Sequence, residues 1–85
     1  MISNRPTVGG TTTTLVTPFH SAGYPMSAAI KNPGPGTVFL GGAQVTTATG
    51  FPLETNEAIT VDVVNEPIYA VATVTTTIYI FRRGD

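Results

Sequence analysis

The clearest pattern of apolar and polar positions lies in the second half of the chain. Ile59, Val61 and Val63 alternate with Thr60 and Asp62, so an apolar side chain occurs at every second position. Successive side chains of a β-strand point to opposite faces of its sheet. The alternation therefore predicts a strand with one buried face and one solvated face.

Two further segments of this half also have strand patterns. Residues 68–72 (Ile-Tyr-Ala-Val-Ala) are apolar on both faces, which predicts a central strand, and residues 73–82 alternate again. In the alternating segment, one face is expected to hold Val74, Thr76, Ile78 and Ile80, and the other Thr75, Thr77, Tyr79 and Phe81. The residues expected to share one core are Leu53, Ile59, Val61, Val63, Val71, Ile78 and Ile80.

The first half of the chain is interrupted more often by glycine and proline. Residues 32–36 (Asn-Pro-Gly-Pro-Gly) and 48–52 (Ala-Thr-Gly-Phe-Pro) have the composition of turns. The strands expected around them lie within residues 11–17, 26–31, 37–40 and 43–47. Residues 26–31 also allow a helical turn, and residues 43–47 either continue the preceding strand or begin a new one.

The whole chain is predicted to be one small β domain with a tail. Residues 1–10 have no strand or helix period and end in Gly9-Gly10, so they are expected to form an extended N-terminal arm. The remaining residues 11–85 are enough for one domain. Because 38 of the 85 residues are β-branched or aromatic, the expected fold is all-β, a small antiparallel β-sandwich or barrel that carries the arm.

Charge and cysteine content narrow the possible partners. The chain has four basic and five acidic residues, a net charge of −1 and no cysteine. Disulfides and thiolate metal sites are therefore excluded, and no nucleic-acid partner is expected, because too few cations are present to neutralise phosphates. No membrane partner is expected either. The uncharged stretch 6–30 contains three prolines and four consecutive threonines, which do not suit a membrane-spanning helix.

The polar residues do not combine into a recognisable reactive site. His20 is the only histidine, and Glu54, the nearest carboxylate in the sequence, is more than thirty residues away. Neither a general base nor a metal site is therefore indicated. The glycine-rich segments lack the Lys-Ser/Thr sequel of a phosphate-binding loop. We expect no enzymatic activity, no metal and no cofactor.

Several motifs occur in a specific order. Residues 36–42 (Gly-Thr-Val-Phe-Leu-Gly-Gly), 45–47 (Val-Thr-Thr) and 49–53 (Thr-Gly-Phe-Pro-Leu) precede the two strand patterns at 57–63 and 68–72. This succession resembles a pattern in small virion proteins of tailed bacteriophages and in terminal domains of phage head fibres. The resemblance covers about residues 32–81. The pattern usually has glycine before its Glu, where this chain has Asn56. Asparagine is the non-glycine residue that best tolerates positive φ, so a left-handed turn is still expected.

The resemblance implies a capsid decoration (cement) protein. Such a protein binds the outer surface of the assembled phage head and stabilises it by bridging capsid subunits. The implied partner is the major capsid protein, and the implied location is the outer capsid surface, after synthesis in the host cytoplasm. A homotrimer is expected as well, because the core is small and few charges keep the surface monomeric. The residues expected to contact the capsid or a neighbouring subunit are Arg5, Thr7, Val8, Tyr69, Tyr79 and Phe81, with Val71 a further candidate for the subunit contact.

Two other functions are considered beside this one. The main alternative is a phage fibre or tail-associated module that binds a host-surface glycan, for which exposed aromatic side chains near Tyr24 and Phe51 would be suited. A small enzyme is the third and weakest hypothesis, because no convergent set of polar residues supports it.

Overall fold

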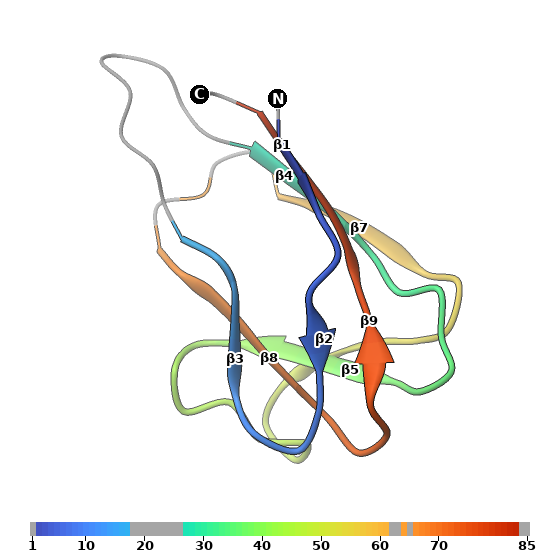
Figure 1. Cartoon of the computed structure of the whole chain (residues 1–85). Coiled ribbons are helices and arrows are strands. Elements are labelled where there is room, and N and C mark those ends of the chain that lie inside the picture. Colours follow the sequence, from blue (N-terminus) through green and yellow to red (C-terminus); the bar gives the residue numbers. More distant parts are fainter. Residues whose placement is uncertain (1, 18–26, 62–63, 65, 84–85) are drawn as a thin grey trace.

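The computed structural model of the chain describes residues 2–17, 27–61, 64 and 66–83 (Figure 1). Within these ranges the regular secondary structure is entirely β, as the composition predicts. The strands are β1 (Ile2–Asn4), β2 (Thr7–Val8), β3 (Thr13–Val16), β4 (Ser27–Lys31), β5 (Val38–Gly41), β6 (Phe51–Leu53), β7 (Ala58–Val61), β8 (Ile68–Ala72), β9 (Thr76–Thr77) and β10 (Tyr79–Arg83).

The strands form two four-stranded antiparallel sheets and a short connecting pair. The first sheet has the order β1-β10-β4-β7 and is called here the β10 sheet. The second has the order β3-β8-β5-β6 and is called the β8 sheet. Strands β2 and β9 pair with each other between them. The prediction of a small antiparallel sandwich is confirmed, and β8 is central in its sheet, as its apolar pattern indicates.

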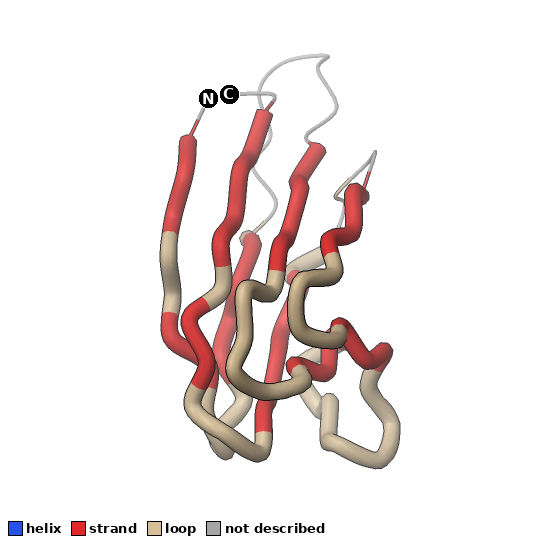
Figure 2. Tube along the Cα trace, turned by 90° about the vertical axis from the view of Figure 1, so that its right-hand side faces the viewer, coloured by secondary structure: helices blue, strands red, loops and turns tan. Residues whose placement is uncertain are grey.

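The pairing of the strands is nested along the chain. β1 pairs with β10, β2 with β9, β3 with β8, β4 with β7, and β5 with β6. The chain is thus one long antiparallel ribbon that turns back between β5 and β6, and Figures 1 and 2 show its strands running alongside one another. The additional pairs β10–β4 and β5–β8 roll this ribbon into two layers. Eight antiparallel strands in two sheets, with the chain crossing between them, form a jelly roll.

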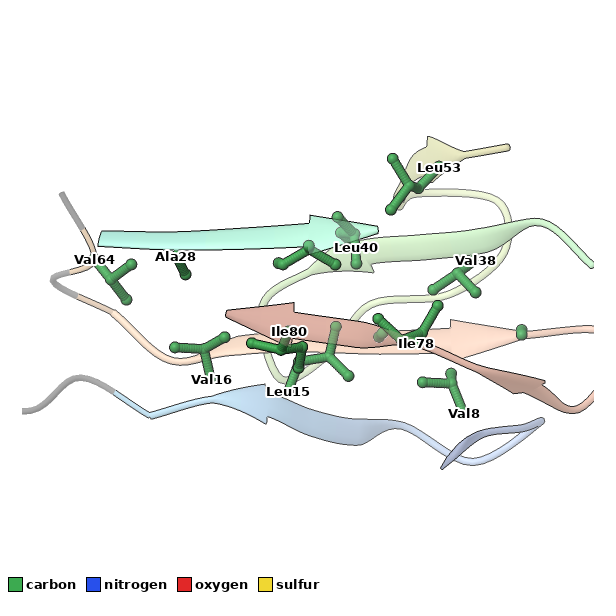
Figure 3. Packing of buried hydrophobic residues seen from close by; sticks show 13 residues of the cluster. Val8, Leu15, Val16, Ala28, Val38, Leu40, Leu53, Val64, Ile78 and Ile80 are labelled. Atoms are coloured by element: carbon green, nitrogen blue, oxygen red, sulfur yellow. The ribbon is translucent and has the colours of Figure 1, made fainter. Parts of the chain in front are cut away.

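The hydrophobic core fills the space between the two sheets. Figure 3 shows side chains from both layers meeting there. The fully or nearly fully buried members are Val8, Leu15, Val16, Ala28, Ile30, Val38, Leu40, Leu53, Val64, Ala70, Ala72, Ile78 and Ile80. Of the expected core residues, Leu53, Ile78 and Ile80 are confirmed, while Ile59 and Val61 are partly buried against the cluster. Val63 lies outside the described residues.

Val71 is buried, but it does not belong to the common core. Its neighbours Ala70 and Ala72 point into the core, so alternation places Val71 on the outer face of the β8 sheet, opposite Phe39. The prediction that it shares the core is therefore wrong. Because only 6% of the residue is exposed, its side chain is not offered to a neighbouring subunit either.

Residues 2–10, for which an extended arm is predicted, run beside the β domain and pair with it at β1 and β2. β1 lies along β10, and β2 pairs with β9 (Figure 1). The Ile78 N–H donates to the carbonyl oxygen of Pro6, and the Ala72 N–H donates to that of Gly9. Val8 is fully buried in the core. The arm therefore completes one edge of the β10 sheet and links the two sheets.

Residues 43–47 form a loop, and the prediction of a strand there is wrong. The segment 42–50 folds back through local hydrogen bonds: the N–H groups of Thr49 and Gly50 both donate to the carbonyl oxygen of Thr46. The Thr46 side chain also accepts from the N–H groups of Ala48 and Thr49. Threonine hydroxyls compete with sheet pairing in this way. A Cβ at Gly50 would lie 2.6 Å from that of Phe39, so only glycine allows the loop to approach β5 so closely.

The following segment forms a strand where the prediction placed a turn. Phe51–Leu53 pair with β5 as strand β6, at the edge of the β8 sheet. Proline lacks an N–H and is tolerated at such an edge. Pro52 therefore does not prevent the pairing.

Candidate docking surface on the β10 sheet

The outer face of the β10 sheet carries two aromatic rings beside each other on one strand. Ile80 points into the core, so its neighbours on β10, Tyr79 and Phe81, point outward. Their exposed fractions are 41% and 43%. Phe51 and Val74 are the other large apolar side chains of the described residues with comparable exposure. The rings thus form an apolar surface that the chain itself does not cover.

Strand register arranges the neighbours of these rings in two rows. In the first row Phe81 lies between Ser3 on β1 and Ala29 on β4. In the second row Tyr79 is paired with Lys31 on β4. Ala58 on β7 follows Lys31 in the same row. A small side chain, Ala29, therefore lies next to the Phe81 ring, and Lys31 lies between Tyr79 and Ala58.

Arg5 completes the second row from the other side. Its guanidinium carbon lies 5.1 Å from the centroid of the Tyr79 ring, which is within the range of a cation–π contact. Tyr79 is therefore flanked by cations on both neighbouring strands. A groove of about 460 Å³ opens on this face and is lined by residues 3–5, 29–31, 58 and 79–81.

Among the described residues, the charged side chains on this face are mainly positive. Arg5, Lys31 and Arg83 all have exposed side chains on strands of the β10 sheet or directly beside them. They are three of the four basic residues of the chain. Among the described carboxylates, Glu57 lies closest in sequence to the groove, but its Oε1 accepts a 2.7 Å hydrogen bond from the Glu54 N–H in the β6–β7 turn.

A second hollow opens between the two sheets, beside the edge strands β6 and β7. It has a volume of about 390 Å³ and is lined mainly by aliphatic side chains, with Phe51 and Glu66 at its margin. Phe51 is 59% exposed. This cleft lies where the core reaches the open edge of the sandwich.

The structure brings together part of the predicted contact set. Arg5, Tyr79 and Phe81 line the same groove. Thr7 is exposed on β2, which pairs with β9 and does not belong to the β10 sheet. Tyr69 is half-buried on the outer face of the β8 sheet, and the Val8 side chain is fully buried. Val8 therefore cannot make the predicted surface contact, because its side chain fills the core.

Lys31, Ala29 and Ala58 were not identified as candidates from the sequence. The weak alternation of residues 26–31 places Ala29 and Lys31 on one face. Only the strand register shows that this face is shared with Tyr79 and Phe81.

Several residues considered for a reactive or binding site lie outside the described part of the chain. His20, Tyr24, Asp62 and Asp85 lie in segments that the structure does not describe. Among the residues that it does describe, no group of three potential metal ligands occurs. The same residues contain no helix long and apolar enough to cross a membrane. No protein-family model, curated protein or solved structure matches this chain.

Proposed function

We propose that this chain is a capsid decoration protein of a tailed bacteriophage, and that it binds the outside of the assembled head through the outer face of its β10 sheet. The observation that carries the proposal is the uncovered pair Tyr79 and Phe81, in a groove beside Arg5 and Lys31. Exposed apolar surface with a polar rim is typical of a protein interaction site.

The general properties of the chain support the same role. A decoration protein needs a stable body, apolar contact area and little net charge, and this chain is a compact β-sandwich with net charge −1. Jelly rolls occur in viral capsid domains and in lectin domains. Fold alone does not assign a function, so this analogy adds to the resemblance of residues 32–81 and does not replace it.

Binding only to the assembled head explains how such a protein stabilises a shell. A ligand that binds one state stabilises that state by an amount set by its concentration and affinity. A chain that contacts two neighbouring copies of the major capsid protein therefore opposes their separation. We propose a homotrimer on the shell, which would multiply these contacts.

The test is binding to heads of the phage that encodes this chain. Purified protein is mixed with expanded heads that lack it, and bound protein is measured after sedimentation. Heads should bind the wild-type chain and release their DNA at a higher temperature. Phe81→Ser should weaken binding. Val74→Ser, which changes an equally exposed residue outside the groove, should not.

Two results would contradict the proposal. The first is that wild-type protein fails to sediment with heads. The second is that a map of the virion places the chain on the fibre or tail. Binding of the chain to a glycan array would then favour the alternative function as a host-binding module.

A further inference from the structure

We infer that the groove on the β10 sheet is a carboxylate-binding site, and that its occupant is an acidic segment of the partner protein with apolar residues next to its acidic ones. This inference rests on the proposed function and specifies which chemistry on the capsid surface the chain recognises. It follows from the positions of three side chains: Arg5, Lys31 and Tyr79.

The two cations stand on either side of the Tyr79 ring. Lys31 is the register partner of Tyr79 on β4, and Arg5 follows β1 on the opposite side. Neighbouring strands are about 4.8 Å apart, so the Cα atoms of these two residues are about 10 Å apart. Both side chains are long enough to converge on one anionic group above the ring.

The guanidinium of Arg5 already lies close to the position of such a contact. It lies over the Tyr79 ring at 5.1 Å from the ring centroid. A cation–π contact uses no hydrogen-bond acceptor, so the guanidinium keeps N–H groups that can donate to a carboxylate. The contact also restricts an otherwise mobile side chain, so less conformational entropy is lost on binding.

The other side chains that line the groove are mainly apolar, and several of them are small. Phe81 forms one side, and the small residues Ala29 and Ala58 form the floor. Apolar side chains of the bound segment can fill this space while its carboxylates meet the cations. A phosphate-rich ligand would gain little from the rings. A neutral glycan would stack on the rings but would leave Arg5 and Lys31 without an anionic partner.

Charge complementarity also excludes a second copy of the same face as the occupant. Pairing this face with itself would bring Arg5, Lys31 and Arg83 of two chains together. Like charges at an interface are unfavourable. The face is therefore expected to meet a surface of opposite charge.

The first experiment uses a peptide and does not depend on the phage. A short synthetic peptide of alternating glutamate and leucine is added to the full chain, and amide chemical shifts are followed by NMR. We expect shifts concentrated at Arg5, Lys31 and Phe81. A peptide in which glutamine replaces glutamate should cause much smaller shifts. Equal shifts with both peptides, or shifts confined to the β8 sheet, would overturn the inference.

The second experiment uses heads and two variants of equal net charge. Arg5→Gln with Lys31→Gln removes two positive charges from the groove. Gln44→Glu with Thr47→Glu adds two negative charges at exposed positions of the 42–50 loop. The groove variant should bind heads about tenfold more weakly at low salt and lose most of its salt dependence. The loop variant should bind as the wild type does.

The outcomes separate this inference from the proposed function. If heads bind the wild type, and both variants bind equally with the same salt dependence, the partner is not recognised through its carboxylates. If heads do not bind at all, the decoration function fails, and the peptide experiment still decides the chemistry of the groove. Thermal unfolding of both variants checks that neither has lost its fold.

Discussion

Asn32 joins two turns that are more than twenty residues apart in the sequence. Its side-chain Nδ2 donates to the carbonyl oxygens of Gly36 and Leu53, both at 2.7 Å, and its Oδ1 accepts from the Gly34 N–H at 2.9 Å. Its backbone also bonds to Asn56 and Glu57. The residue is fully buried. A single side chain thus holds the β4–β5 turn against the β6–β7 turn.

We predict that Asn32→Ala lowers the free energy of unfolding by about 2–4 kcal/mol, because it removes the partners of one N–H and two carbonyl groups that are buried or partly buried. Asn32→Asp should be worse at neutral pH, since a carboxylate cannot donate to the two carbonyl oxygens. Urea denaturation measures both, with the exposed Gln44→Ala as the control. A loss below half a kilocalorie for Asn32→Ala would mean that water replaces these bonds.

Asn56 has a φ of 69°, so the left-handed turn expected from the sequence is confirmed. We predict that Asn56→Gly leaves stability nearly unchanged and that Asn56→Val costs about 1–2 kcal/mol, because a β-branched residue is strained in this region. The side chain is exposed, so packing does not confuse the comparison. Chemical denaturation of the pair provides the test. Equal stability of the two variants would argue that the turn changes shape.

For single residues, the sequence predicts the backbone conformation better than it predicts long-range hydrogen bonds. The tolerance of asparagine for positive φ is a local property, and it identifies Asn56 directly. The role of Asn32 depends on the carbonyl oxygen of Leu53, which the fold brings near. From the sequence, Asn32 could be assigned only to a turn.

Among the elements, the alternation is predicted well from Thr76 to Phe81, whereas residues 73–75, expected in the same strand, lie outside the strands and Val74 is exposed. The outward position of Tyr79 and Phe81 and the central position of β8 both follow from apolar patterning. Short elements are predicted poorly: residues 43–47, expected in a strand, form a loop, and β6 forms where the sequence predicts a turn. Val45 is buried because its own loop folds back over it. An apolar residue buried in a loop gives the same sequence pattern as one in a strand. Four of the ten residues that line the groove lie on β4 and β7, and the sequence does not specify the register of these strands with β10.

Strand β6 is short, and its contribution depends on one side chain. Leu53 is 2% exposed and faces Val38 on β5. We predict that Leu53→Ala costs about 2–5 kcal/mol, through lost apolar burial and the cavity that remains. Thermal or urea unfolding measures the loss, and Phe51→Ala on the same strand, where the side chain is largely exposed, should cost much less. Comparable losses at both positions would show that the strand, and not the core contact, controls stability.

The mobility of residues 1–10 in the unbound chain stays a prediction. The low apolar content and Gly9-Gly10 favour motion, whereas the pairing of β1 with β10 and the burial of Val8 favour order. NMR order parameters along residues 3–8 distinguish these cases. We expect values below those of β4 for Ser3 and Asn4, which lie on an edge strand, with order increasing toward Val8. Uniformly high values would exclude a mobile arm.

The whole molecule offers two separate apolar regions, the groove around Phe81 and the exposed Phe51 beside the cleft at the sandwich edge. The positive charges disfavour self-association through the groove. We therefore predict that the trimer, if present in the free protein, forms through the edge region. Phe51→Ser should yield monomers in light scattering that still bind heads, more weakly than the trimer because the contacts are no longer multiplied. Phe81→Ser should keep the oligomer and lose head binding. If Phe81→Ser gave monomers and Phe51→Ser lost head binding, the groove would form the trimer and the edge region would bind the head.

The nested ribbon has a consequence for biosynthesis. β10 lies between β1 and β4 in its sheet, although it is the last strand in the chain order. While residues up to Arg83 are still inside the ribosome, β1 and β4 have no partner on the sides that face each other. The inner halves of the ribbon, β5 with β6 and β4 with β7, can form earlier because less chain separates them. Closure of the sandwich must therefore follow release of the last strand, and a chain stalled before Tyr79 exposes both the core and two unpaired strand edges to aggregation.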